Sequence, residues 1–327
     1  MNELQAIVQA LAEQRSPASS VLATLVMVEG SSYRQPGARL LVAADGTRIG
    51  SVSGGCLEED VIERARSVRE SGRAQLATYD TTSENDLVWG VGLGCHGVVR
   101  VLIERVTARP AWSEVLAGNL SKGLATPIEV VWQAGEPSAL GTRLGSGKTG
   151  GKGIFCEIVP PPPRLVIFGA GDDARPLVRL ASELGWRIAV ADPRPAFASA
   201  RRFPEADTVV SSPADQLVAR ANPGEDDLAV VMTHHYVHDV PILRDLLARP
   251  LAYLGLLGPR RRAERILGDL SANPGARARL HAPAGLDLGG DTPAEVALSM
   301  IAEMRAVLAG RDARSLRERT QPIHSGQ

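Results

Sequence analysis

The sequence predicts an α/β protein in which an N-terminal α+β domain precedes a C-terminal Rossmann-like domain with a parallel sheet. Three observations support this fold class. A glycine-rich nucleotide-binding pattern begins at Leu165, strands and helices alternate after it, and the run Pro160–Pro163 separates it from a hairpin-rich first part. We expect an N-terminal α+β domain, a β-ribbon extension with a proline-rich linker, the Rossmann-like domain and a flexible tail, over residues 1–108, 109–163, 164–310 and 311–327.

The first part of the chain predicts two helices among short strands. Residues 3–15 and 57–70 each carry apolar side chains at helical spacing. Asp45-Gly46 is typical of a hairpin turn between two strands. The expected strands cover residues 20–28, 38–43, 48–52, 73–79 and 98–106, and residues 121–159 resemble a β-ribbon.

The second part alternates strands with helices, which predicts a parallel sheet with helices on both faces. The expected strands cover residues 165–168, 187–191, 207–211, 228–232 and 252–256. The expected helices between and after them cover residues 173–184, 213–221, 239–248 and 259–270. A last helix begins at Thr292-Pro293-Ala294-Glu295, which supplies a cap, a proline at the first helical position and a capping-box glutamate.

Composition is that of an ordinary globular protein and excludes several classes. Of 327 residues, 22% are charged and the formal net charge is −1, so we expect no nucleic acid and no acidic membrane surface as partner. The first residues lack the features of a signal peptide, and no apolar run approaches the ~18 residues that span a membrane. The three cysteines are widely spaced, so we expect reduced thiols and a cytoplasmic protein.

The most informative pattern is a nucleotide-binding βαβ unit over residues 165–192. Gly169 allows a tight turn, and Gly171 lets backbone amides approach a pyrophosphate at the helix N-terminus. Ala174 stands at the third glycine position. Asp192 lies 21 residues past Gly171, where a carboxylate can accept hydrogen bonds from ribose hydroxyls.

Two aspartates, Asp172 and Asp173, directly follow the second glycine of this pattern. They suit a helix N-terminus, whose dipole favours negative charge. They would repel a bound phosphate if they faced it. The alternative interpretation is therefore an α/β fold that has lost its ligand.

A first candidate site in the N-terminal part is Gly50-Ser-Val-Ser-Gly-Gly-Cys-Leu-Glu-Glu-Asp60. The pattern predicts a strand end, a turn at Gly54 and Gly55, and Cys56 at a helix start, where the dipole favours the thiolate. Two free backbone amides in the turn would suit an anion, whereas the acids that follow oppose a thiolate. The alternative is a small buried cysteine in a tight turn.

A second candidate is Trp89–Gly97, in which four glycines within eight residues indicate a close backbone approach to a ligand or another strand. Cys95 and His96 could be metal ligands or sulfur carriers. Cys95 and Cys56 both follow glycine-rich turns, so the two thiols are candidates to converge. The alternative is a structural glycine-rich loop in which the cysteine has its contacts within the chain and binds no ligand.

Two further candidates follow strands of the predicted parallel sheet, whose carboxyl ends line a ligand crevice. Thr233–Asp239 carries three histidines, of which His234 is the first candidate for ligand contact. A zinc site would need a further ligand, and helix capping by the final aspartate is the alternative. Arg260 begins a run of three arginines that could meet phosphate or simply lie on the surface.

Together these motifs resemble the XdhC/CoxI family, the xanthine dehydrogenase accessory factors. The resemblance covers nearly the whole chain, with the matches in order along it. Several ordered matches are far more specific than one glycine motif. The matching segments are Gly30–Arg39, Gly50–Glu58, Gly92–Cys95, Ile167–Gly171, Tyr253–Gly258 and Gly285–Pro293.

The resemblance implies that the chain binds the molybdenum cofactor, as molybdopterin or its dinucleotide form. It also implies help with sulfuration of the cofactor and with insertion into an apo molybdenum hydroxylase of xanthine dehydrogenase or CO dehydrogenase type. Cys56 or Cys95 would contact molybdenum or carry sulfur, because soft thiolates suit that metal. A cysteine desulfurase and a second copy of the chain, as a homodimer, are further implied partners. The candidate cofactor-binding residues are Gly54, Gly55, Cys56, Cys95, Gly169, Gly171, Ala174, Asp192, His234 and Arg260.

The alternative function is that of an NAD(P)-dependent oxidoreductase that uses the Rossmann-like domain. A dehydrogenase needs a proton-transfer residue within reach of the nicotinamide, and His234 and His238 are the candidates. A cofactor-binding chaperone needs reactive thiols, an open cleft and a docking surface, and it turns over no substrate. The residues alone leave these two functions near parity, and the family resemblance favours the chaperone.

Overall fold

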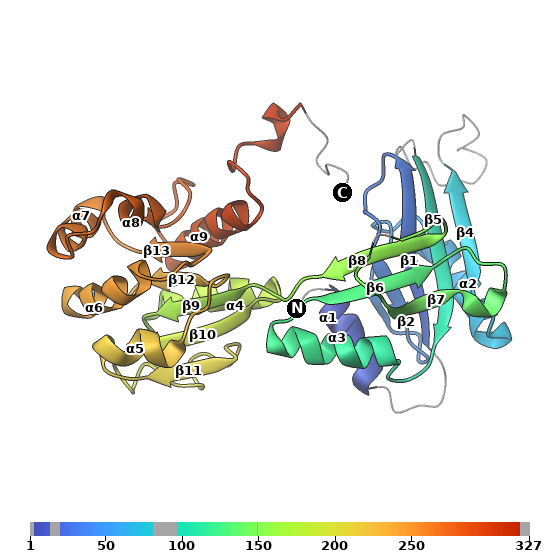
Figure 1. Ribbon diagram of the computed structural model, residues 1–327, viewed down its shortest axis with the longest axis horizontal. Coiled ribbons are helices and arrows are strands. Elements are labelled where there is room, and N and C mark those ends of the chain that lie inside the picture. Colours follow the sequence, from blue (N-terminus) through green and yellow to red (C-terminus); the bar gives the residue numbers. More distant parts are fainter. Residues whose placement is uncertain (1–2, 14–19, 81–96, 149, 321–327) are drawn as a thin grey trace. The chain divides into compact units, whose positions relative to one another are not determined.

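The computed structural model describes residues 3–13, 20–80, 97–148 and 150–320 of the chain. These residues divide into two compact units between Pro161 and Pro162, inside the proline run that the sequence singles out. Each unit has its own β-structure (Figure 1). Each also has its own apolar cores. Each is therefore described by itself.

The first unit is built on an antiparallel sheet with the strand order β3-β2-β1-β5-β4. The long central strand β1 is buried along most of its length, because apolar layers cover both faces of the sheet. All of these strands lie where the sequence predicts them, within a few residues. Their bounds are Ser20–Gly30 (β1), Arg39–Val42 (β2), Arg48–Gly50 (β3), Gln75–Asp80 (β4) and Gly97–Val106 (β5).

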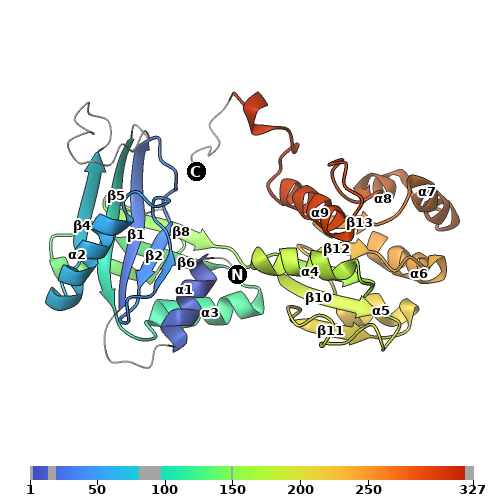
Figure 2. The same ribbon diagram turned by 180° about the vertical axis from the view of Figure 1, so that it is seen from behind.

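Helix α2 (Glu58–Ser71) covers one face of this sheet, and α1 (Glu3–Glu13) and α3 (Ala111–Lys122) cover the other. Helices α1 and α3 lie side by side in both views (Figures 1 and 2). A second sheet of order β7-β6-β8 completes the second core and confirms the predicted β-ribbon, whereas α3 was not predicted. Its elements are Thr126–Val131 (β6), Gly141–Leu144 (β7), Ile154–Val159 (β8) and the short 3-10 helix Pro137–Ala139 (η2).

The second unit contains a parallel sheet of order β11-β10-β9-β12-β13-β14. This is the order of a dinucleotide-binding Rossmann fold, which confirms the predicted fold class. The predicted strands are all present, and the short edge strand β14 is an addition. The bounds are Arg164–Phe168 (β9), Arg187–Asp192 (β10), Thr208–Ser211 (β11), Leu228–Val231 (β12), Tyr253–Leu256 (β13) and Leu280–His281 (β14).

Helices cover both faces of the parallel sheet. Helices α4 (Ala174–Glu183) and α9 (Pro293–Leu308) pack on one face. The helices on the other face are Ala214–Ala221 (α5), Tyr236–Leu247 (α6), Arg260–Asp269 (α7) and the short Pro274–Arg279 (α8), of which α8 was not predicted. The 3-10 helix Leu316–Glu318 (η3), which follows α9, was not predicted either. Across the described residues, no helix combines the length and apolar character that a membrane crossing requires.

The helix starts test two sequence predictions. The capping box of α9 is confirmed, because the Thr292 side chain accepts from the Glu295 amide and the Glu295 carboxylate accepts from the Thr292 amide at 3.0 Å. Helix α6 begins at Tyr236, earlier than predicted. Asp239 therefore lies inside its first turn and is buried, so the alternative that Asp239 caps this helix is wrong.

Candidate functional site

Two motif-bearing loops leave the same end of the antiparallel sheet. Strand β1 ends there at Gly30, and the antiparallel neighbours place the start of β2 and the end of β3 at this end as well. The loops are residues 31–38 and 51–57. They touch, since a Cβ atom at Gly54 would lie 2.8 Å from ring carbons of Tyr33.

The carboxylate of Glu58 fills the turn that precedes α2. Its two oxygens accept four backbone amides and two serine hydroxyls, which come from Ser51, Val52, Ser53, Gly55 and Leu57. Burial alone would raise the pKa of Glu58, but the hydrogen bonds from Ser53 and Ser51 outweigh it and lower the pKa to about 2. The loop is thus held in one shape by its own ionised carboxylate.

This carboxylate changes the interpretation of the glycine turn. The Gly55 amide donates to Glu58 at 2.9 Å, and the Gly54 amide donates to the Ser51 hydroxyl at 3.0 Å. The expectation of two free amides is therefore wrong for this structure. Contact of Gly54 and Gly55 with a ligand stays a prediction.

Cys56 is exposed at the tip of the turn, one residue before the cap of α2. Its sulfur lies 3.9 Å from the Ser53 carbonyl oxygen, which is a weak contact. The alternative of a small buried cysteine is therefore wrong. The thiol is open to a ligand from outside the chain.

Cys95 and His96 lie outside the described residues, so a convergence of the two cysteines stays a prediction. The residues that flank this segment are described. Asp80 pairs with Val98, and Gly97 pairs with Gly30, at the same end of the sheet as the two loops. A Cβ atom at Gly97 would lie 2.3 Å from the Ser31 carbonyl oxygen, so only glycine fits this close approach.

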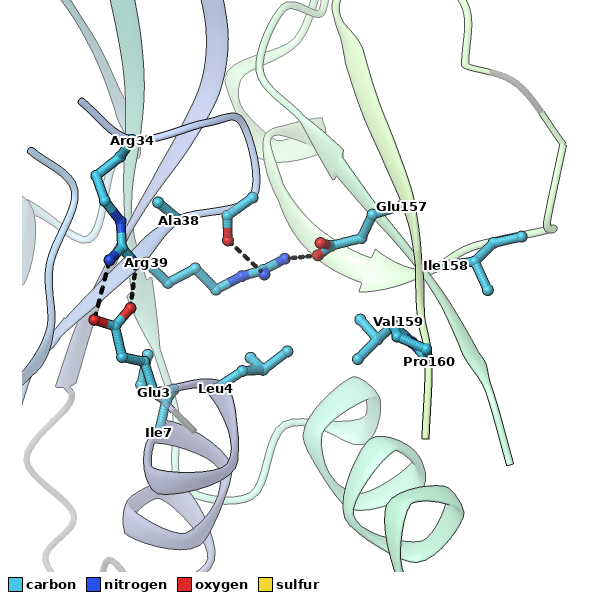
Figure 3. Close-up of a pocket in the computed structure, with 11 residues that line it drawn as sticks. Glu3, Leu4, Ile7, Arg34, Ala38, Arg39, Glu157, Ile158, Val159 and Pro160 are labelled. Carbon is cyan, nitrogen blue, oxygen red and sulfur yellow. Dashed lines mark hydrogen bonds and ion pairs between the residues drawn. The ribbon is translucent and has the colours of Figure 1, made fainter. Parts of the chain in front are cut away.

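The motif Gly30–Arg39 also supplies two arginines to a pocket of about 250 Å³ (Figure 3). Arg34 pairs with Glu3, and Arg39 pairs with Glu157 on β8 and donates to the Gly37 carbonyl at 3.0 Å. The Arg39 side chain is 4% exposed. Each arginine already has a carboxylate partner, so the arrangement ties β2 and α1 to their neighbours and leaves no free positive charge for an anion.

In the second unit, the strand order reverses between β9 and β12, so the carboxyl ends of these two strands border a crevice. Gly169 follows β9 with φ +128°, and a Cβ atom there would lie 2.5 Å from the Met232 carbonyl oxygen. His234 follows β12 with φ +60°, a left-handed conformation uncommon for a residue other than glycine. The predicted tight turn at Gly169 is confirmed.

Asp173 lies where the sequence predicts a phosphate. A Cβ atom at Gly171 would be 2.4 Å from Asp173 Oδ1, so the carboxylate covers this glycine. The other oxygen, Oδ2, lies 2.5 Å from His234 Nε2. This bond outweighs burial and raises the pKa of His234. A phosphate at Gly171 would meet a like charge unless Asp173 turned away.

Asp192 is fully buried. Its carboxylate accepts from the Ala170 amide at 2.7 Å, from the Arg194 amide at 2.8 Å and from the Arg194 guanidinium at 2.8 and 2.9 Å. Burial would raise the pKa of Asp192, and these bonds lower it instead. Contact with a ribose stays a prediction, and it requires Arg194 to release the carboxylate.

The remaining predicted residues divide between the interior and the surface. Ala174 begins α4 and is fully buried, which explains a small residue at the third position of the motif. Arg260 is exposed at the start of α7. Its neighbour Arg262 instead pairs with the buried Asp239, which also accepts from the Thr233 hydroxyl at 2.5 Å. This network supports the turn that carries His234.

Two residues gain roles that the sequence analysis did not give them. Glu58, one of the acids after Cys56 that the sequence predicts to oppose a thiolate, is the acceptor that organises the loop. Asp173, which the sequence predicts to suit a helix N-terminus and to repel phosphate, forms a pair with His234. Among the described residues, no group of three or more His, Cys, Asp or Glu side chains could hold a metal ion.

These features define a protein in which a Rossmann-like unit follows an α+β unit that exposes a thiol at a sheet end. The chain belongs to the XdhC and CoxI family. Residues 165–304 match the family model described as the XdhC Rossmann domain, and residues 13–80 match the one described as the XdhC and CoxI family.

Individual relatives agree with this assignment. A Bacillus subtilis (strain 168) protein, named as a probable xanthine dehydrogenase subunit, is 34% identical over 93% of this chain and 97% of its own length. The Escherichia coli (strain K12) "Molybdenum cofactor insertion chaperone PaoD" is 26% identical over 88% of this chain and 83% of its own length. A crystal structure of a xanthine dehydrogenase from Bacillus halodurans superposes with a TM-score of 0.80 and 31% identity, covering 97% of this chain and 98% of that one.

Proposed function

We propose that this chain binds the molybdenum cofactor as cargo, holds it during sulfuration and delivers it to an apo molybdenum hydroxylase of xanthine dehydrogenase or CO dehydrogenase type. Family membership and the name of the relative that inserts this cofactor support the proposal. The single observation that carries it is the exposed Cys56 thiol on a loop fixed by Glu58.

The chemistry of this loop fits such a cargo. A thiolate is a soft ligand and suits molybdenum better than a carboxylate or an amide does. Glu58 fixes the loop before the cargo arrives, so binding orders few additional groups and loses little conformational entropy. Cys56 therefore contacts molybdenum directly or holds the sulfur that is to be transferred.

Several finer points belong to the same proposal. Cys95 acts as a second thiol, a cysteine desulfurase supplies the sulfur, and the chain works as a homodimer. The oxidoreductase alternative has less support. An NAD(P) phosphate would meet Asp173 at Gly171, and the ribose acceptor Asp192 is already saturated.

The test compares Cys56→Ser with the control Cys156→Ser under anaerobic conditions. Cys156 is half-buried on β8, and burial raises the pKa of its thiol. Each protein is mixed with molybdenum cofactor, passed through a size-exclusion column and analysed for molybdenum per chain. We expect Cys56→Ser to retain at least about tenfold less, the scale typical of a lost group at a metal site, and the control to match the parent. Equal retention by both variants would overturn the thiol's role.

A further inference from the structure

We propose that the Rossmann-like unit recognises the ring of a 2-amino-4-oxo heterocycle, a pterin or a guanine, through the carboxylate of Asp173. The inference rests on the proposed function, because it takes the pterin of the molybdenum cofactor as the first source of this ring. It follows from a cavity, from the charges at its rim and from the hydrogen-bonding pattern that those charges select.

The cavity lies between α4 and α9 at the carboxyl end of the parallel sheet and has a volume of about 280 Å³. Its walls are apolar and include Leu177, Met232 and Met300, with Val296 and Ala297 of α9. Such walls suit the faces of a flat ring. The volume is near the lower end of the range for small-ligand pockets, about 300–1,000 Å³, which fits a bicyclic ring better than a whole dinucleotide.

The rim of the cavity is acidic. Asp173 and Asp291 both line it, and so does His234. Arg194 acts electrostatically on Asp173, but its guanidinium is hydrogen-bonded to Asp192. An anionic group such as a phosphate is therefore disfavoured at this rim, whereas a group that donates hydrogen bonds is favoured.

A pterin or guanine ring carries the donors that this rim requires. Its ring N–H and its neighbouring amino group point the same way, so one carboxylate can accept both at once. Within the described residues, Asp173 has His234 as its hydrogen-bonding partner, and that contact uses Oδ2. The incoming ring would replace His234 at this carboxylate. Loss of the histidine should therefore free the acceptor and tighten binding.

The experiment measures binding of pterin and of lumazine to the full-length protein by equilibrium dialysis with fluorescence detection. Lumazine has an oxo group where pterin has the amino group, so it lacks the second donor. We expect the parent protein and the control Asp172→Asn to bind pterin about 10- to 100-fold more tightly than lumazine. Asp172 is 80% exposed and does not line the cavity. Asp173→Asn should lose the preference, and His234→Asn, whose new residue tolerates positive φ, should bind pterin more tightly than the parent.

Each outcome has a consequence. If the parent distinguishes neither pterin from lumazine nor guanosine monophosphate from adenosine monophosphate, or if Asp173→Asn keeps the preference of the parent, the inference is overturned. Guanosine monophosphate is tested in parallel with adenosine monophosphate, which lacks the paired donors. A preference for guanosine alone would assign the site to guanine, and a preference for pterin alone would assign it to the cofactor's ring. If the protein retains molybdenum cofactor but distinguishes neither pair of compounds, the proposed function stands and this inference fails. If the protein prefers pterin to lumazine but does not retain molybdenum cofactor, this inference stands and the proposed function fails.

Discussion

Protein carboxylates occupy three places where the sequence suggested an incoming ligand. Glu58 fills the glycine turn, Asp173 covers Gly171, and Asp192 accepts the amide that follows Gly169. The sequence shows that acids are near these turns, but it does not show which of several neighbouring acids folds back. That choice depends on the backbone dihedral angles of each turn, which short-range patterns do not specify. Residue types at the site were thus predictable, and their pairing was not.

The role of Glu58 leads to a stability prediction. Glu58→Gln replaces a carboxylate, which only accepts hydrogen bonds, by a side-chain amide. The NH₂ group of this amide is a donor and cannot accept from the backbone N–H groups of the loop. We expect the free energy of unfolding to fall by about 1–2 kcal/mol at neutral pH, the scale of a lost helix cap. The matched control Glu59→Gln, at an exposed neighbouring acid, should change it little.

The pH dependence of this difference follows from the lowered pKa. Glu58 is ionised in the folded chain down to about pH 2, whereas its ordinary value is 4.5. Its contribution is therefore complete above pH 4.5 and is lost as pH falls toward 2. Urea unfolding of the parent and of Glu58→Gln across this range should show a shrinking difference, and a constant difference would contradict the assignment.

His234 gives the opposite pH dependence. Its pKa is raised above 6.5, mainly by the hydrogen bond to Asp173, while Arg262 opposes and Asp239 assists. Its stabilising contribution is present below pH 6.5 and is lost as pH rises through the raised pKa. The stability advantage of the parent over His234→Asn, measured by urea unfolding, should therefore shrink as the pH rises above 6.5 and through the raised pKa. The change in backbone strain at this position does not depend on pH, so a pH-independent difference would exclude the Asp173 pair as its source.

At the scale of elements, the helices and strands with strong periodicity were predictable and the weaker ones were not. Helix α3 has Trp112 and Leu116 on its buried side, but Gly118 and Asn119 lower the helix propensity of the segment. Tertiary packing against α1 compensates for that weakness. Helix α6 begins early because the hydrogen bond from the Thr233 hydroxyl to Asp239 fixes the first residues of the helix. Helix propensities describe single residues and do not include such a contact between two side chains.

The close approach of β9 and β12 leads to a prediction at the same scale. Gly169→Ala would place a methyl group 2.5 Å from the Met232 carbonyl oxygen at a positive φ. We expect a loss of about 2–4 kcal/mol in the free energy of unfolding. Gly268→Ala is the control, since it lies in α7 with nothing within 4 Å, and there we expect a gain of up to about 1 kcal/mol. Chemical denaturation of the two variants checks both signs.

For the whole molecule, the proline run was enough to predict a division into two parts, because prolines cannot extend a central strand or a helix. The assignment of residues 109–161 was harder. They form α3 and the second sheet, which belong to the first unit and share an apolar core with α1. Long-range packing of this kind leaves little trace in local sequence, so the sequence predicts a separate extension where the structure has part of one core.

Separate cores lead to the last prediction, which concerns independent folding. Residues 162–327 contain both apolar clusters of the parallel sheet, and residues 2–161 contain both clusters of the first unit. We therefore expect each fragment to unfold cooperatively in urea when expressed alone. Trp186 is buried in the second unit, while the other tryptophans belong to the first, so fluorescence reports on each fragment separately. If the 162–327 fragment shows no cooperative transition, its stability depends on the first unit, and the chain must fold as one body despite its two sets of cores.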